Sequence, residues 1–121
     1  MKVKIDTKEK FHVITIEEKE LPANMTEDLQ KLLLSFAEKI PGNIILNLIN
    51  IQQIHELIGH TFASVQQTFY DLNCSFVICN LQPAVETLLD TKELLEIMNI
   101  TRTESEAWDI VQMEEIEREL F

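Results

Sequence analysis

The residues whose types come closest to a catalytic or metal-binding motif are His55, Glu56 and His60. A zinc-protease helix carries its two histidines four residues apart, so that both reach one ion from one face. Here the histidines are five apart, which separates them by roughly 140° around a helix. His12 is left open as a third ligand, because its spacing neither joins it to the pair nor excludes it. We expect no metal site and interpret these residues as polar side chains at a strand-to-helix turn.

The other reactive side chains do not form a catalytic set. Cys79 lies within an apolar run, and Cys74 follows a predicted helix end beside no base, so both are expected to be buried, reduced thiols. On one strand they would point to opposite faces and could not pair with each other. Gly42 and Gly59 belong to no phosphate-binding pattern, and no serine lies in a nucleophile elbow. We therefore expect no enzyme and no cofactor; a hydrolase built on the histidine–glutamate pair is the weakest hypothesis.

Asn43–Thr61 holds these histidines and is the stretch around which the predicted fold is organised. Ile44–Ile49 is almost entirely apolar, which is typical of a strand covered on both faces. A short polar elbow follows, and a helix then runs to about Leu72, with its inward side chains at steps of three and four: Ile58, Phe62, Val65 and Phe69. Ligands and partners commonly meet α/β proteins at such a junction.

The rest of the chain alternates between strand and helix patterns. Strands are predicted at Val3–Ile5, Phe11–Ile16, Phe76–Cys79 and, at a sheet edge, around Ile100. Helices are predicted from a cap at Asn24 or Thr26 to about Lys39, from Gln82-Pro83, and from a cap at Thr103, with Leu94, Leu95, Ile97 and Met98 forming an inward-packing turn. Strands separated by helices require crossovers, so we expect an α/β fold with a mixed, mostly parallel sheet of four to five strands and about four helices.

Composition predicts a single domain over residues 1–121. The 21 acids outnumber the 10 bases, and the net charge of −11 repels nucleic-acid phosphates and anionic lipid surfaces. No run approaches the roughly 20 apolar residues of a membrane span, and the N-terminus lacks the apolar core of a signal peptide. We therefore predict a cytoplasmic protein with no nucleic-acid partner and no direct membrane insertion.

The predicted last helix, about 104–121, is strongly acidic. Its acids are Glu104, Glu106, Asp109, Glu114, Glu115, Glu117 and Glu119, against the single base Arg118. The favoured interpretation is a solvated helix face, and the alternative is a docking surface for a basic partner. Leu120 and Phe121 give this helix an apolar end that could pack on the domain or on a second copy of the chain.

The stretch CSFVICNLQPAVETLLDTKELLEIMNI resembles the closing half of a STAS domain, the fold of anti-sigma-factor antagonists. The positions that match the family pattern are Asn80, Pro83, Val85, Leu88, Leu89, Leu94, Ile97 and Ile100. The opening half agrees in outline, with NIILNLINI where the family has an apolar strand ending in Asp-Leu-Ser. The resemblance covers nearly the whole chain and implies a STAS-like fold in a bacterial regulatory protein.

The elbow departs from the family. Phosphorylation-regulated members carry Asp-Ser-Ser-Gly there, and the second Ser, or a Thr, accepts the phosphate. Aligned without a gap, His55–Ile58 occupies these positions and Leu57 replaces the acceptor; with one residue inserted, Glu56–Gly59 does, and Ile58 replaces it. Neither residue has a hydroxyl, so we expect that the phosphate switch is lost.

The resemblance implies a non-catalytic interaction module whose usual family partner is a kinase-like anti-sigma factor or a larger assembly. The expected partner-binding residues are His55, Glu56, Leu57, Ile58, Gly59, His60 and Thr61. Of the adjacent Leu57 and Ile58, we expect one to point inward and the other to face a partner. The alternative is a sensory or transport-accessory domain that binds a nucleotide or lipid, with His55, His60 and Asn80 as its polar contacts.

Overall fold

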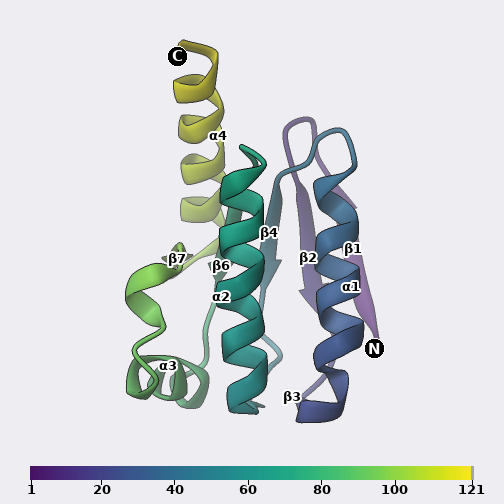
Figure 1. The fold of residues 1–121 in the computed structure, drawn as a ribbon, viewed down its shortest axis with the longest axis vertical. Helices are drawn as coiled ribbons and strands as arrows, with labels where there is room; N and C mark the ends of the chain where they lie inside the picture. The colour runs from purple at the N-terminus through teal and green to yellow at the C-terminus, as the bar shows by residue number, and fades with distance from the viewer. Residues whose placement is uncertain (121) are drawn as a thin grey trace.

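The computed structural model describes residues 1–120 (Figure 1). Its helices are α1 (Thr26–Ala37), α2 (Glu56–Asp71), α3 (Pro83–Thr91) and α4 (Glu104–Leu120), and 3₁₀ turns span Ala23–Met25 and Leu95–Ile97. Its strands are β1 (Val3–Thr7), β2 (His12–Ile16), β3 (Glu20–Leu21), β4 (Ile44–Asn47), β5 (Gln53–Ile54), β6 (Phe76–Cys79) and β7 (Ile100–Thr101). The predicted last helix residue, Phe121, lies outside the described range.

The central sheet has five strands in the order β1-β2-β4-β6-β7. β1 pairs with β2 in antiparallel fashion, and every other pairing in this sheet is parallel. The mixed, mostly parallel sheet and the four helices of residues 1–120 confirm the predicted fold class. β7 lies at the edge, where it pairs with only the last two residues of β6, Ile78 and Cys79.

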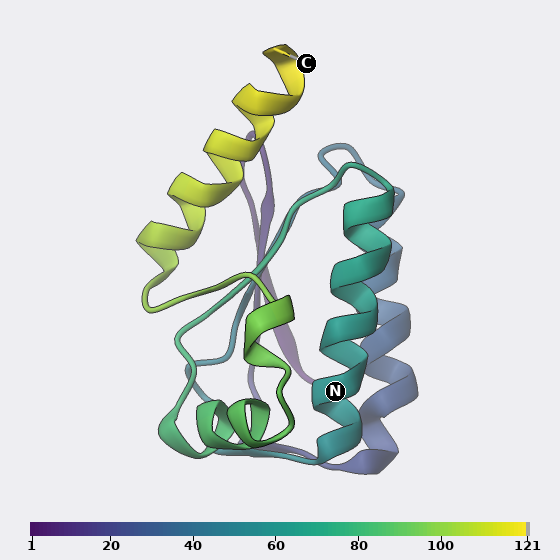
Figure 2. The same cartoon turned by 60° about the vertical axis from the view of Figure 1, so that its left-hand side comes forward.

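Helices cover both faces of the sheet (Figure 2), with α1 and α2 on one face and α4 on the other. Alternation along β2 feeds both layers: Ile14 and Ile16 enter the larger core, whereas Val13 enters the smaller core beneath α4. The four residues of β4 are all buried, as the apolar run predicted. Within residues 1–120, each helix falls short of the length or apolar content that a membrane span requires.

Two local predictions differ from the structure, and two short strands were missed. Neither Asn24 nor Thr26 caps α1, because a 3₁₀ turn leads into the helix and the Thr26 hydroxyl donates to the Ala23 carbonyl at 2.7 Å. The short strands β3 and β5 were not predicted. Ile97 is 60 % exposed rather than packed inward. The cap of α4 is confirmed, since the Thr103 hydroxyl accepts from the Glu106 amide at 3.2 Å.

Candidate functional site

The elbow between β4 and α2 is held by backbone hydrogen bonds. β5 pairs in parallel with β3 through Glu20–Gln53 and Leu21–Ile54. The pairing continues into the helix start, where the amide of His55 donates to the carbonyl of Leu21 at 2.9 Å. This two-stranded sheet therefore fixes the position of the first turn of α2.

His55 and Glu56 satisfy the N-terminus of α2. His55 is the N-cap, and its Nδ1 accepts a hydrogen bond from the amide of Leu57 at 3.1 Å, which requires an unprotonated Nδ1. The Glu56 carboxylate lies 2.8 Å from the ammonium of Lys92, beyond α3. The hydrogen bond and charge of Lys92 lower the pKa of the Glu56 carboxyl. An anionic side chain in the first turn also suits the helix dipole.

Burial divides the predicted site residues into two groups. Leu57 is 49 % exposed, whereas Ile58 is fully buried in the larger core, so one of the pair points inward and the other outward, as expected. Thr61 is buried too, and its hydroxyl donates to the Leu57 carbonyl at 2.9 Å. The residues that a partner could touch directly are therefore the exposed ones: His55, Glu56, Leu57 and His60.

Gly59 has a packing role beneath this surface. A Cβ atom at this position would lie 3.0 Å from Leu89 Cδ2 and 3.1 Å from Leu94 Cδ1. The absence of a side chain thus lets Leu89 of α3 and Leu94, just beyond it, pack closely against α2. Its contribution to a partner site is indirect, through the position of its neighbours.

His12 has a structural environment of its own. The residue is buried, its Nδ1 lies 2.8 Å from the Thr7 hydroxyl, and its Nε2 lies 3.0 Å from the Pro41 carbonyl. The carbonyl can only accept, so Nε2 donates to it, and in the neutral ring Nδ1 then accepts from the Thr7 hydroxyl. No group of three metal-ligating side chains occurs among residues 1–120.

Shallow hollows flank the elbow. One of about 610 Å³ lies between the approach to β3 and the residues of β5, and another of about 450 Å³ lies beside Ile49, which is 52 % exposed. Neither is lined by His55, His60 or Asn80, the polar contacts expected for a small ligand.

A polar network holds α4 at the opposite end of β4 and β6. The buried Asn43 side chain donates to the Lys10 carbonyl at 3.0 Å and to Glu115 at 2.6 Å, and it accepts from the Ser75 amide at 2.7 Å. Arg118 donates to Ser75 Oγ at 3.0 Å and to Glu115 at 2.9 Å. The bonds from Asn43 and then Arg118 lower the pKa of Glu115. This carboxylate is therefore a structural acceptor.

Glu104 is a second acid of α4 with structural partners. Its carboxylate accepts from the Trp108 indole at 3.1 Å and from the Asn47 side chain at 3.2 Å. The interpretation of the acidic helix as one solvated face is therefore wrong for Glu104 and Glu115. Both partner asparagines come from the β4 region, far away in the sequence.

The two cysteines are free thiols. Burial raises the pKa of Cys79 to about 12, and burial also raises that of Cys74. Cys79 is buried, as predicted, but Cys74 is only partly buried. A thiol with a raised pKa is a poor nucleophile at neutral pH.

Comparison with known proteins gives one family. A family model described as STAS domain matches residues 2–107. None of the curated protein sequences matches significantly.

Solved structures share the fold. A candidate anti-sigma factor antagonist of Thermotoga maritima is 19 % identical with a TM-score of 0.77, covering 91 % of this chain and 94 % of that one. An anti-sigma-factor antagonist (STAS) domain protein of Planctomyces limnophilus is 13 % identical with a TM-score of 0.78, covering 91 % and 97 %. The match to a murine Solute Carrier 26 family anion transporter is 10 % identical with a TM-score of 0.71, covering 89 % of this chain and 18 % of that chain.

Proposed function

The chain belongs to the STAS domain family, and from this premise we propose that it is a non-catalytic regulatory module that binds a protein partner through the first turn of α2. The observation that carries the proposal is the exposure of Leu57 beside the fully buried Ile58. An apolar side chain at 49 % exposure, on a helix end fixed by β3 and β5, offers a rigid contact whose burial by a partner is favourable.

The residues around Leu57 give this contact a polar rim. His55, Glu56 and His60 are exposed, and Glu56 is oriented by Lys92. Apolar centres with polar rims are typical of protein–protein interfaces. The proposed contact surface, which we call the elbow surface, consists of His55, Glu56, Leu57 and His60; the buried Ile58, Gly59 and Thr61 support it from below.

The elbow surface has no hydroxyl phosphate switch. A phosphate at a helix N-terminus adds about −2 charge and changes what the surface can bind. His55–Gly59 contains no Ser, Thr or Tyr, and the hydroxyl of Thr61 is buried and bonded to Leu57. We therefore expect that phosphorylation of a hydroxyl does not change what this surface binds.

A kinase-like anti-sigma factor or a larger assembly is the proposed class of partner. The solved relatives from Thermotoga maritima and Planctomyces limnophilus are described as anti-sigma-factor antagonists, which supports this choice. We place the module in the bacterial cytoplasm as a single domain over residues 1–121.

Affinity capture with the full chain tests the elbow surface. Leu57→Asp combined with His60→Ala is expected to release the protein partner that the wild-type chain retains, because it puts a charge where an apolar contact is buried. Ile40→Asp, at a 99 % exposed position in the loop before β4 and so at the other end of that strand from the elbow, is the matched control and should retain the partner. Retention of every partner by the double variant would contradict the proposal.

Phosphate mapping tests the lost switch. The chain is incubated with ATP and a captured kinase-like partner, and modified sites are identified by mass spectrometry. We expect no phosphate on a hydroxyl within His55–Gly59, and Leu57→Ser should create an acceptor there. A failure of Leu57→Ser to accept phosphate would show that the partner does not treat this position as the family acceptor.

A further inference from the structure

The two halves of α4 differ in whether their apolar side chains face the sheet or the solvent. Its first turns bury Ala107 and Val111 against the smaller core. Beyond Val111 the apolar side chains face solvent: Met113 is 60 % exposed, Ile116 56 % and Leu120 72 %. The side chains that face the sheet in this half are instead Glu115 and Arg118.

The exposed apolar residues form one continuous feature. Met113, Ile116 and Leu120 are separated by three and four positions, so they are neighbours along one face of the helix. We call them the outer stripe. In Figures 1 and 2 this half of α4 lies at the end of the molecule opposite α3. A contiguous apolar patch with a charged border is typical of an interaction site.

The border of the outer stripe is negative. Glu117 is four residues after Met113 and three before Leu120. Glu119 is three after Ile116 and lies 3.9 Å from the ammonium of Lys10, so Glu117 is the border acid that this pairing leaves available. The helix has one base, Arg118, which bonds to Ser75 on the sheet side. Two copies meeting through this face would bring like charges together, on chains that each carry −11. Charge therefore favours a basic partner over a second copy.

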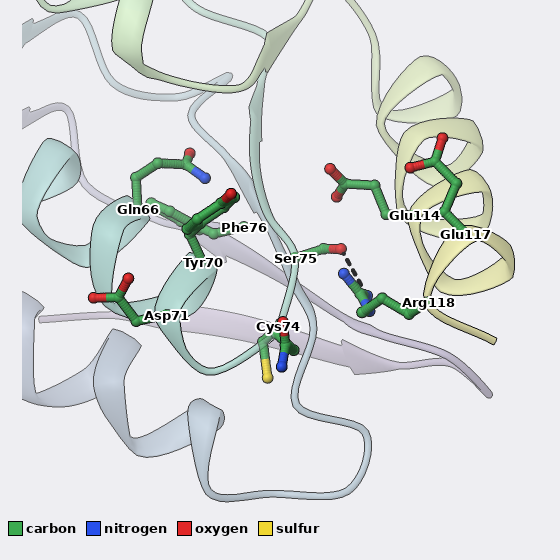
Figure 3. A pocket seen from close by; sticks show the side chains of 10 residues that line it. Gln66, Tyr70, Asp71, Cys74, Ser75, Phe76, Glu114, Glu117 and Arg118 are labelled. Atoms are coloured by element: carbon green, nitrogen blue, oxygen red, sulfur yellow. Dashed lines mark hydrogen bonds between the residues drawn. The ribbon is translucent and has the colours of Figure 1, made fainter. Parts of the chain in front are cut away.

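A groove extends this negative surface toward α2 (Figure 3). It has a volume of about 760 Å³; Glu114 and Glu117 lie on one side, and Tyr70 and Asp71 lie on the other. Arg118 also lines it, but its guanidinium bonds to Ser75 and Glu115, and the three acids outnumber this one base. Tyr70 is 74 % exposed, so its ring can take an apolar or cationic side chain. Because Glu117 borders the outer stripe and also lines the groove, one bound segment could contact both.

We propose that the outer stripe and this groove bind a basic amphipathic helix of a protein partner, at a second surface separate from the elbow surface. The apolar face of that helix packs on Met113, Ile116 and Leu120. Its Lys or Arg side chains pair with Glu114, Glu117 and Asp71. This is the helix-against-helix mode of recognition, in which apolar anchors supply affinity and flanking charges select the partner.

The test uses a labelled synthetic helix as the probe, with Leu at steps of three and four and Lys on both flanks, titrated into the full chain. We expect Met113→Ser/Ile116→Ser to weaken binding about tenfold or more, since two buried apolar contacts are lost. Glu114→Lys/Glu117→Lys should weaken it similarly, and added salt should weaken binding to the wild type.

The controls separate this surface from general attraction and from the elbow. Asp28→Lys/Glu38→Lys makes the same charge change on and beside α1 and should change the affinity less than Glu114→Lys/Glu117→Lys does. Leu57→Ser should leave it unchanged, so the proposal can fail while the elbow surface stands. Circular dichroism checks that each variant is folded.

Three results would overturn the proposal. The first is that a peptide of the same composition in scrambled order binds as tightly as the probe. The second is that the Met113→Ser/Ile116→Ser variant binds the probe as tightly as the wild type does. The third is that the wild type binds no probe and sediments as a dimer, whereas the Met113→Ser/Ile116→Ser variant sediments as a monomer. That result would make a second copy of the chain the occupant of this surface.

Discussion

Different interactions position α2 and α4 at the two opposite ends of the parallel strands. At the elbow, burial of apolar side chains acts together with the backbone pairing of β3 and β5 to position the first turn of α2. Ile58 lies in the larger core, and Gly59 leaves room for Leu89 and Leu94 to pack against the helix. At the other end, the last turns of α4 are positioned by hydrogen bonds from Asn43 and Arg118.

The difference explains which side chains each end can offer to a partner. Where apolar packing holds a helix, most of its apolar residues are used inside, and Leu57 is the one left outside in the first turn of α2. Where polar bonds hold a helix, its apolar residues are free to face outward, as Met113, Ile116 and Leu120 do. The two ends should also differ in how they respond to mutation.

The largest expected effect separates two adjacent residues at the elbow. Ile58→Ala should lower the free energy of unfolding by about 3 kcal/mol, because it leaves a cavity in the core. Leu57→Ala should change it by less than about 0.5 kcal/mol, as at other surface positions. Chemical denaturation of both variants measures the contrast, and equal losses would mean that apolar burial does not distinguish the two positions.

The next effect tests the polar end. Asn43→Ala should destabilise the protein by about 2 kcal/mol, because the Ser75 amide and the Lys10 carbonyl lose their partner. Amide hydrogen exchange should show faster exchange in α4 than in α2, since α4 loses its anchor. Uniform loss of protection in both helices would instead make the network part of the common core.

The smallest effect concerns the charge of Glu115. Its pKa is lowered on folding, so the ionised carboxylate stabilises the protein above its unfolded pKa, and this contribution disappears as pH falls through the folded pKa. Glu115→Gln should therefore cost about 1 kcal/mol at neutral pH and progressively less in acid. Denaturation curves of the wild type and of Glu115→Gln across that range measure the difference, and a cost that does not change with pH would contradict the role of the charge.

Periodic burial explains what could be predicted from the sequence. In the run Ile44–Ile49 every residue except Asn47 is apolar, and apolar residues recur at helical spacing from Ile58 to Phe69, so β4 and α2 were predictable. β3 and β5 contain two residues each within polar stretches and give no periodic signal. Each of them is a strand only through its hydrogen bonds to the other, which the folded chain brings alongside it.

The inward acids of α4 were missed for a related reason. Glu115 and Glu104 look like solvated residues because sequence patterns register charge but not tertiary partners. Their acceptor roles depend on Asn43 and Asn47, which are 72 and 57 residues away. In the elbow, the sequence was enough to expect that only one of Leu57 and Ile58 points outward, but the fold was needed to say which.

Gly59 gives independent control over the geometry of the elbow. The terminal carbons of Leu89 and Leu94 would lie 3.0 and 3.1 Å from a Cβ atom at this position, so any side chain at residue 59 must push them away. A graded series of Ala, Ser and Val at this position should shift these leucines by increasing amounts, and with them Lys92, which lies between them in the sequence and orients Glu56. The series replaces no residue of the elbow surface itself. Binding affinity plotted against added volume would then report how much of recognition depends on shape rather than on residue identity.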